Sequence, residues 1–275
     1  MNNYAAHPLR RVWAFLVRDY HVETSYRLSF LFTIGGVVVR ALVFFFLSEF
    51  IEAATGGMLG DYGGDYFSFV IIGIALGGYF STGLTSFAKA LRQSQTTGTL
   101  EAMILTPTPV SWLIIGSASW SYVYTTFRVL IYLVIGALFL GLDLSRANYL
   151  AALVILILSV ISFASLGILA ASLIMVIKRG DPITAVFGNL SNLIGGVFYP
   201  IAILPTWLQL IAYLLPITYA LRAMRGALLA GATWSQLAPD IVALCLFCLI
   251  LFPLALLVFR YAVDRARSEG TLAHY

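Results

Sequence analysis

Long apolar runs, separated by short polar segments, dominate this sequence of 275 residues. A helix needs about 20 consecutive apolar residues to cross the hydrocarbon core of a bilayer. We interpret six of the runs as membrane spans: 28–47, 66–87, 110–140, 149–177, 183–198 and 241–263. The pattern predicts an all-α polytopic membrane protein whose residues 1–275 form a single transmembrane domain.

The N-terminal segment 8–23 has a different pattern, because its apolar residues recur every three or four positions. That spacing places one set of side chains on the same face of a helix, namely Leu9, Val12, Trp13, Leu16, Val17 and Tyr20. Arginines fall between them, as in helices that lie in the membrane interface. We expect an amphipathic helix on the membrane surface, and packing against a partner protein is the alternative.

Residues 91–107 form a polar island between the second and third predicted spans. Gly98 can serve as a helix N-cap, and Glu101 suits the first turn of a helix, where a negative charge is favourable. Pro107 would end the helix because it has no N–H group to donate. A helix over 99–105 is too short to be stable alone, so we expect it to dock on a partner. Its apolar face would consist of Leu100, Met103 and Ile104.

Residues 205–229, before the last predicted span, contain two short apolar pieces. Pro205 and Pro216 bound the first piece, of about eight residues, which is too short to cross a bilayer. The second piece carries Arg222 and Arg225. We expect a pair of short helices that re-enters the membrane from the outer face.

Basic residues are distributed unevenly between the two sides of this topology. With the N-terminus inside, eleven fall on inner segments: Arg10, Arg11, Arg18, Arg27, Lys89, Arg92, Lys178, Arg179, Arg260, Arg265 and Arg267. The outer segments hold three: Arg146, Arg222 and Arg225. Because cytoplasmic segments carry the excess of Lys and Arg, we expect six spans with both termini in the cytoplasm.

A few polar side chains within the spans are candidates for a transport path. Arg40 interrupts the first span, and a charge in lipid costs roughly 2.5–3.5 kcal/mol on insertion scales. Asn189 and Asn192 are three residues apart in the fifth span and would share a helix face. Other roles remain open, since Arg40 could extend its head toward the interface and the asparagines could tie helices together.

The second span also contains Gly73 and Gly77, which have the GxxxG spacing. Small residues at this spacing allow another helix to approach closely. The spacing is common by chance in glycine-rich spans, so it identifies no partner helix.

The sequence lacks the motifs of several function classes. It contains no GxxxxGK[ST] loop and no soluble segment large enough for a nucleotide-binding domain. We find no His/Glu metal cluster and no Ser/His/Asp set, so we expect neither a catalytic residue nor a metal site. No acidic residue lies deep in a predicted span, which weighs against a proton-driven carrier. The net charge of +4 comes from basic residues near span ends and does not indicate nucleic-acid binding.

Two regions carry a resemblance to a known family. The first has the sequence Gly98-Thr99-Leu100-Glu101 followed by Thr106-Pro107, and it resembles the coupling segment of type-2 ABC exporter permeases. The second runs from Gly196-Val197-Phe198-Tyr199-Pro200 through Leu215-Pro216 to Arg225-Gly226 and is similar to the outer re-entrant region of that family. The likeness is greatest to the bacterial drug- and lipid-exporting branch, because the polysaccharide branch often has Asn-Pro at Leu215-Pro216. One departure is that Gln95, Thr96 and Thr97 replace an acidic residue that often precedes the first motif.

The resemblance implies the other subunits of a transport complex. Two copies of this permease would associate, and each would dock a separate ATPase subunit that binds ATP and Mg²⁺, so this chain itself would need no cofactor. The coupling contact would be made by Gly98, Thr99, Leu100, Glu101, Met103 and Ile104. The complex would lie in the bacterial inner membrane and export an amphipathic molecule, either drug-like or lipid-like. A polysaccharide or glycolipid exporter is the alternative within the family; a secondary transporter and a membrane-embedded lipid-modifying enzyme are the alternatives outside it.

Overall fold

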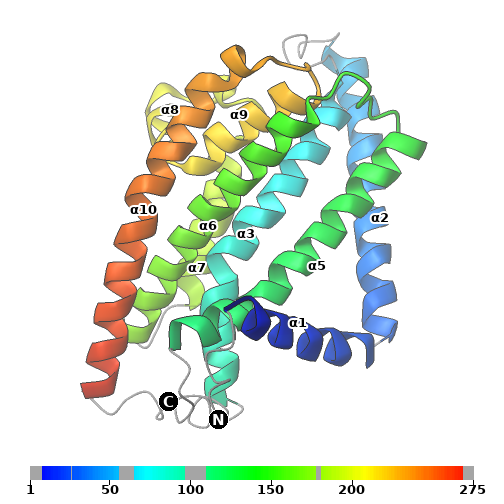
Figure 1. Cartoon of the computed structure of the whole chain (residues 1–275). Helices are drawn as coiled ribbons and strands as arrows, with labels where there is room; N and C mark the ends of the chain where they lie inside the picture. Colours follow the sequence, from blue (N-terminus) through cyan, green and yellow to red (C-terminus); the bar gives the residue numbers. More distant parts are fainter. Residues whose placement is uncertain (1–7, 26, 56–64, 97–109, 178–180, 269–275) are drawn as a thin grey trace.

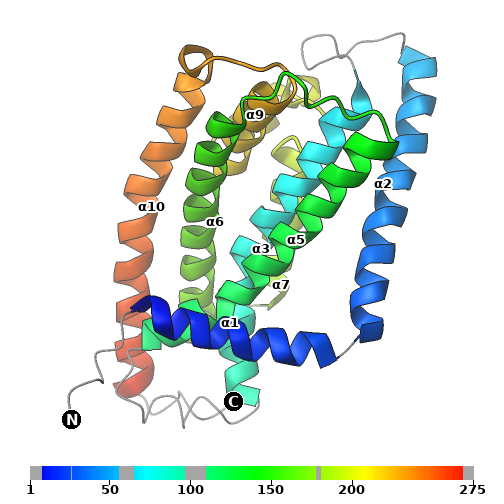
Figure 2. The same cartoon turned by 45° about the vertical axis from the view of Figure 1, so that its right-hand side comes forward.

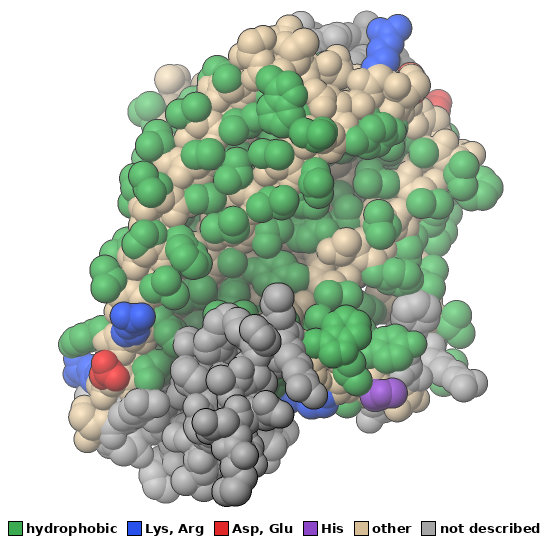
Figure 3. Space-filling model, viewed as in Figure 1, with side chains coloured by type: hydrophobic (Ala, Val, Ile, Leu, Met, Phe, Trp, Pro, Cys, Tyr) green, Lys and Arg blue, Asp and Glu red, His purple; other side chains and the backbone are tan. Residues whose placement is uncertain are grey.

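The computed structural model describes residues 8–25, 27–55, 65–96, 110–177 and 181–268. Five long helices run side by side along one axis (Figure 1), and each contains a stretch long and apolar enough to cross a membrane. They are α2 (Arg27–Thr55), α3 (Tyr66–Thr96), α5 (Val110–Phe139), α6 (Tyr149–Ile177) and α10 (Trp234–Ser268). The face of the molecule seen in Figure 3 is mostly hydrophobic between its two ends, where the coloured charged groups gather. This surface confirms the expected all-α polytopic membrane protein.

Helix α1 (Pro8–Ser25) lies across one end of the bundle of long helices (Figure 2). It packs on α5, where the ring of Phe15 occupies the space beside Gly116 and Tyr20 meets Trp120 edge to face. Trp13 and Val17 remain exposed. This arrangement agrees with the predicted interfacial helix. We call this end of the bundle, where α10 also finishes, the α1 end.

Helix α7 (Asp181–Ile194) starts at the α1 end and differs from the other predicted spans in length. Its 14 residues extend roughly 21 Å, less than the ~30 Å hydrocarbon core. The predicted span 183–198 is therefore wrong at its C-terminal end, because the helix stops at Ile194. The chain continues through a turn to the short 3-10 helix η2 (Ile201–Ile203). Gly196 has a φ of +89° in this turn, a conformation that side chains with a Cβ rarely adopt.

Helices α8 (Thr206–Ala212) and α9 (Pro216–Leu228) lie at the opposite end of the bundle (Figure 1), which we call the α9 end. Both begin at the proline boundaries seen in the sequence, since Pro205 precedes α8 and Pro216 is in the first turn of α9. The predicted pair of short helices is present. Whether it re-enters a membrane stays a prediction, as does the count of six spans.

Helix α3 forms the centre of the bundle and packs against α2, α5, α6, α7 and α9. Its closest approach is to α6, where a Cβ at Gly167 would lie 1.8 Å from the carbonyl oxygen of Gly83. Three serines of α6, namely Ser159, Ser165 and Ser172, hydrogen-bond to carbonyls four residues earlier in their own helix, and Ser162 pairs with Cys248 of α10. The polar groups of α6 are thus satisfied without opening its interface with α3.

Candidate functional site

Helix α9 is the most deeply embedded of the short helices. Leu215 precedes it in extended conformation and Pro216 occupies its first turn, where the missing N–H costs nothing. Its apolar side chains are buried against α3, α6 and α10: Ile217, Ala220, Leu221, Met224 and Leu228. Arg222 and Arg225 project from the same helix. We call α9, its two arginines and the groups that they contact the α9 junction.

Arg225 is almost completely buried, with 4% of its surface exposed. Its Nε donates to the carbonyl oxygen of Phe69 at 3.1 Å, and its Nη1 and Nη2 donate to those of Gly196 and Val197, both at 2.9 Å. The guanidinium also lies 3.4 Å from the centre of the Phe69 ring. Irregular backbone at membrane depth must have its polar groups satisfied by protein or water. Arg225 satisfies two carbonyls of the turn that follows α7, and so permits α7 to end early.

Gly73 of α3 packs against both Arg225 and the turn that follows α7. A Cβ at Gly73 would lie 2.1 Å from the carbonyl oxygen of Val197 and 2.7 Å from Nη2 of Arg225. One turn along, a Cβ at Gly77 would meet the side chain of Val197 at 3.3 Å. The spacing does permit a close approach: the turn after α7 approaches at Gly73, and α7 itself approaches at Gly77 through the side chain of Asn192.

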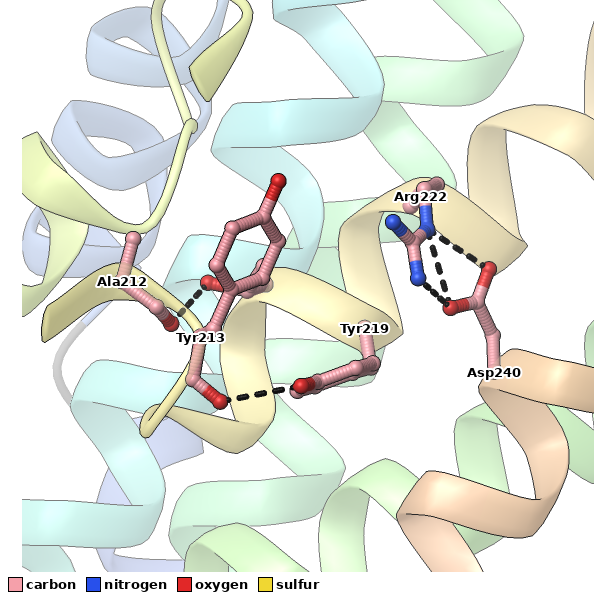
Figure 4. A network of polar contacts seen from close by, with 6 residues as sticks. Ala212, Tyr213, Tyr219, Arg222 and Asp240 are labelled. Atoms are coloured by element: carbon pink, nitrogen blue, oxygen red, sulfur yellow. Dashed lines mark hydrogen bonds and ion pairs between the residues drawn. The ribbon is translucent and has the colours of Figure 1, made fainter. Parts of the chain in front are cut away.

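Arg222 forms an ion pair with Asp240 of α10 (Figure 4). Its Nε donates to both carboxylate oxygens, at 2.9 and 3.0 Å, and its Nη2 donates to Oδ1. Asp240 is 6% exposed, whereas 47% of the Arg222 side chain is exposed. The hydrogen bond to Asp240 raises the pKa of Arg222 above its ordinary value. The pair ties α9 to α10.

The start of α9 is held to α8 by two further bonds in the same view (Figure 4). The Thr218 hydroxyl donates to the carbonyl oxygen of Ala212 at 2.6 Å, and the Tyr219 hydroxyl donates to that of Tyr213 at 3.0 Å. Thr218 is buried, so its hydroxyl would be unsatisfied without Ala212. These bonds fix the angle between the two short helices.

The end of α9 is held by the start of α6. The backbone N–H of Asn148 donates to Ala227, and its Nδ2 donates to the carbonyl oxygen of Ala232 at 3.2 Å. Its Oδ1 caps α6 by accepting from the N–H of Ala151 at 3.1 Å. Gly231, with a φ of +61°, lets the turn pass against the carbonyl oxygen of Arg146. The turn from α9 to α10 is therefore fixed on both sides.

A cavity of about 480 Å³ opens between the end of α9 and the start of α10. Its polar lining residues are Arg222, Arg225, Gln236 and Asp240. Apolar walls come from residues such as Leu229, Leu237 and Pro239. Pockets of this size hold small ligands in many proteins.

The predicted path residues are not brought together. Arg40 is exposed on α2, which packs mainly on α1, α3 and α5, and Asn189 is exposed on α7, which packs mainly on α3 and α8. Asn192 instead faces α3, since its Oδ1 would lie 3.2 Å from a Cβ at Gly77. That oxygen is buried and has no hydrogen-bond partner in the part of the chain described here. The path assignment of these three residues stays a prediction.

The coupling residues Gly98, Thr99, Leu100, Glu101, Met103 and Ile104 lie outside the described residues. The helices that bracket them are described: α3 continues to Thr96, past its candidate span Tyr66–Ala90, and α5 begins at Val110. Both of these helix ends lie at the α1 end (Figure 1). Within the described ranges, no group of three His, Cys, Asp or Glu could hold a metal ion.

Sequence reasoning missed Asp240 and Asn148. The last span was predicted to begin at 241, which places Asp240 outside it, but α10 begins at Trp234 and buries this carboxylate in its second turn. The expectation that no acidic residue lies deep in a span is not affected, because Asp240 lies near the start of α10. A local signal existed, since Thr233 and Gln236 have the spacing of a capping box. The Thr233 N–H does donate to Oε1 of Gln236, at 2.9 Å.

These observations define a helical integral membrane protein with an amphipathic helix at one end and a pair of short helices at the other. The model of the ABC-2 type transporter family matches residues 12–229, which include α1, α9 and most of the bundle. The chain belongs to this family, so it is a permease subunit of an ABC transporter, and such a subunit works with an ATPase partner. No curated protein matches the chain. The resemblance to type-2 ABC permeases is confirmed at the level of the family.

Proposed function

We propose that this permease exports an amphipathic molecule, drug-like or lipid-like, by alternating access. Two copies of the chain would form the path, and each would bind one ATPase subunit at its α1 end. ATP binding would draw the ATPase subunits together, push on the permeases and switch the path toward the outside. The α1 end would face the cytoplasm of a bacterium and the α9 end the outside of the inner membrane.

The observation that carries this proposal is the position of the two helices that flank residues 97–109, in a chain of this family. These helices, α3 and α5, end and begin at the α1 end, beside the interfacial helix. A separate ATPase subunit must act on the bundle at one of its ends. The motif beginning at Gly98, which resembles a coupling segment, lies between these two helices in the sequence. The excess of basic residues on the same side supports a cytoplasmic location for it.

Charge and apolarity changes in the coupling segment test the proposal. Glu101→Arg should leave insertion and chain level intact but weaken association with the ATPase subunit or uncouple ATP hydrolysis from export. Leu100→Asp should have the same effect more severely, because it places a charge on the apolar face. Co-purification of the ATPase subunit and vanadate-sensitive hydrolysis are the measurements. Normal assembly and normal export in both variants would contradict an ATP-driven permease.

The orientation has its own test. Single cysteines at Thr233 and Gly60 should react from outside with an impermeant thiol reagent, in a background without Cys245 and Cys248. A cysteine at Ser268, at the end of α10, should not react. Labelling at Ser268 from outside would mean an inverted chain or an odd number of spans.

A further inference from the structure

We propose that the cavity between α9 and α10 binds the anionic headgroup of an amphipathic molecule, and that Arg222 and Gln236 recognise it. The cavity lies at the α9 end, away from the ATPase contact proposed above. Binding at this cavity does not depend on the direction of transport, so it can be tested without assuming export.

The first recognition group is the guanidinium of Arg222, which lines the cavity and also lies 5.5 Å from the centre of the Tyr219 ring. Asp240 accepts from Nε and Nη2, and the third guanidinium nitrogen, Nη1, lies on the side away from it (Figure 4). This nitrogen donates no hydrogen bond to the described part of the chain. A guanidinium in this state keeps its positive charge and has donors to offer, which suits a phosphate or carboxylate.

The second recognition group is the amide of Gln236. Its Oε1 is fixed as the oxygen, because it accepts from the backbone N–H of Thr233, and it also accepts from the Thr233 hydroxyl at 3.2 Å. Its Nε2 donates to none of the described residues. The open polar atoms of Arg222 and Gln236 are therefore both donors, while both oxygens of Asp240 accept from Arg222. The cavity favours an acceptor-rich ligand.

The position of the cavity along α10 indicates an amphipathic ligand. The candidate span Trp234–Arg265 has 32 residues and extends roughly 48 Å, close to the ~40–45 Å of a bilayer with its headgroups. Its first residues therefore lie at headgroup depth, where tryptophan is enriched. Leu229, Leu237 and Pro239 add apolar wall beside the donors. A headgroup can reach Arg222 while its apolar part stays in the bilayer.

The cavity is also preformed. Asn148 and Gly231 fix the turn that closes it, and the ion pair of Arg222 with Asp240 fixes its polar wall. A site whose donors are already oriented loses little conformational entropy on binding. The arrangement is accordingly suited to selective binding of one headgroup class.

The test measures lipid binding to the purified full-length chain by native mass spectrometry. We expect phosphatidylglycerol to bind about tenfold more tightly than phosphatidylcholine, as for one charge-assisted hydrogen bond. Gln236→Glu should reduce that preference about tenfold, because it retains the acceptor for Thr233 but replaces the donor with a negative charge. Ser235→Glu is the matched control: it adds the same charge one residue away, outside the cavity lining, and should keep the preference.

A second variant removes the cation without leaving a buried carboxylate unpaired. Arg222→Met combined with Asp240→Leu should also abolish the preference for phosphatidylglycerol. An unchanged preference in Gln236→Glu and in the double variant would overturn the site, and so would equal losses in Gln236→Glu and Ser235→Glu. Either result would leave the ATPase co-purification test, and with it the proposed function, unaffected.

Two probes distinguish the source of the headgroup. If the ligand is a bilayer lipid, dodecyl phosphate should compete with phosphatidylglycerol but leave ATP hydrolysis unchanged, because both molecules present an acceptor-rich headgroup. If the ligand is a transported anion, dodecyl phosphate should displace phosphatidylglycerol and stimulate ATP hydrolysis in the wild-type complex but not in Gln236→Glu. Both outcomes support the cavity as an anion site; failure of both anions to bind more tightly than phosphatidylcholine would overturn it.

Discussion

Arg222 and Arg225 are three residues apart on one helix, yet their surroundings are very different. Arg225 is buried, and three backbone carbonyls accept from it. Arg222 is half exposed and has a carboxylate partner, and both arginines are among the residues that line the cavity. The same side chain therefore has two uses in the α9 junction: one replaces missing backbone hydrogen bonds, and the other forms a polar wall. We therefore expect substitutions at these positions, and at the residues around them, to have effects of different size on the stability of the protein.

The largest effect should follow from Arg225→Met. The variant leaves the carbonyls of Phe69, Gly196 and Val197 without this donor, and each buried acceptor that stays unpaired costs about 1–3 kcal/mol. Unfolding by sodium dodecyl sulfate in mixed micelles, followed by tryptophan fluorescence, would measure the loss. Arg225→Lys should lose less, since an ammonium keeps the charge but cannot reach all three oxygens as a planar fork does. Equal stability of Arg225→Met and wild type would contradict the role given to this residue.

The next largest effect on stability should come from Gly73, which packs against Arg225 and Val197. Gly73→Ala places a Cβ 2.1 Å from the carbonyl oxygen of Val197, and overpacking of this kind costs about 1–3 kcal/mol. Gly78→Ala in the same helix is the control, because the nearest atom would be 3.9 Å away. Both changes bring the same gain in helix propensity. The same unfolding assay should separate them, and similar stabilities would show that the turn can move away from α3.

A smaller and asymmetric effect is expected for the ion pair. Arg222→Met leaves the buried carboxylate of Asp240 unpaired, which costs about 1–3 kcal/mol. Asp240→Asn leaves a half-exposed arginine that water can solvate, so its cost should stay below about 1 kcal/mol. Thermal unfolding of both variants in detergent would reveal the order. The reverse order would mean that Asp240 is more accessible to water than its 6% exposure indicates.

The smallest effect on stability should come from Arg40→Ala, because its side chain is exposed on α2, and surface substitutions usually change stability within about 0.5 kcal/mol. Transport is the informative measurement here. Alanine at Arg40, Asn189 and Asn192 together should reduce export or stimulated ATP hydrolysis if these residues line the path. Unchanged export and ATPase activity would contradict the path assignment.

Sequence patterns predicted the parts of this fold that depend on local chemistry. Hydropathy summed over about 20 residues located the five long helices, and Pro205 and Pro216 located the boundaries of the short ones. The end of α7 was not predictable in this way. The carbonyls of Gly196 and Val197 are satisfied by Arg225, which lies 29 and 28 residues further along the chain. No local pattern contains that contact.

In the candidate site, too, local features were predictable from the sequence and long-range contacts were not. The sequence singled out Arg222 and Arg225 as charges on an apolar helix, but it did not distinguish a buried one from an exposed one. Asp240 was left out because hydropathy favours a span that begins after a charge, whereas the capping residues Thr233 and Gln236 start the helix earlier. The spacing of Gly73 and Gly77 indicated a close approach and not its partner. The coupling segment beginning at Gly98 stays a prediction.

The crossing of α3 and α6 has a mechanical consequence. The backbone of Gly167 packs directly against the carbonyl oxygen of Gly83. The two helices therefore cannot come closer at this point. Such a point acts as a fulcrum. Gly83 lies roughly 26 Å from the start of α3 at Tyr66 and roughly 20 Å from its end at Thr96, at 1.5 Å per residue. A tilt of about 10° around it would carry the two ends in opposite directions by about 4.5 and 3.5 Å, so that a push at one membrane face becomes an opposite displacement at the other.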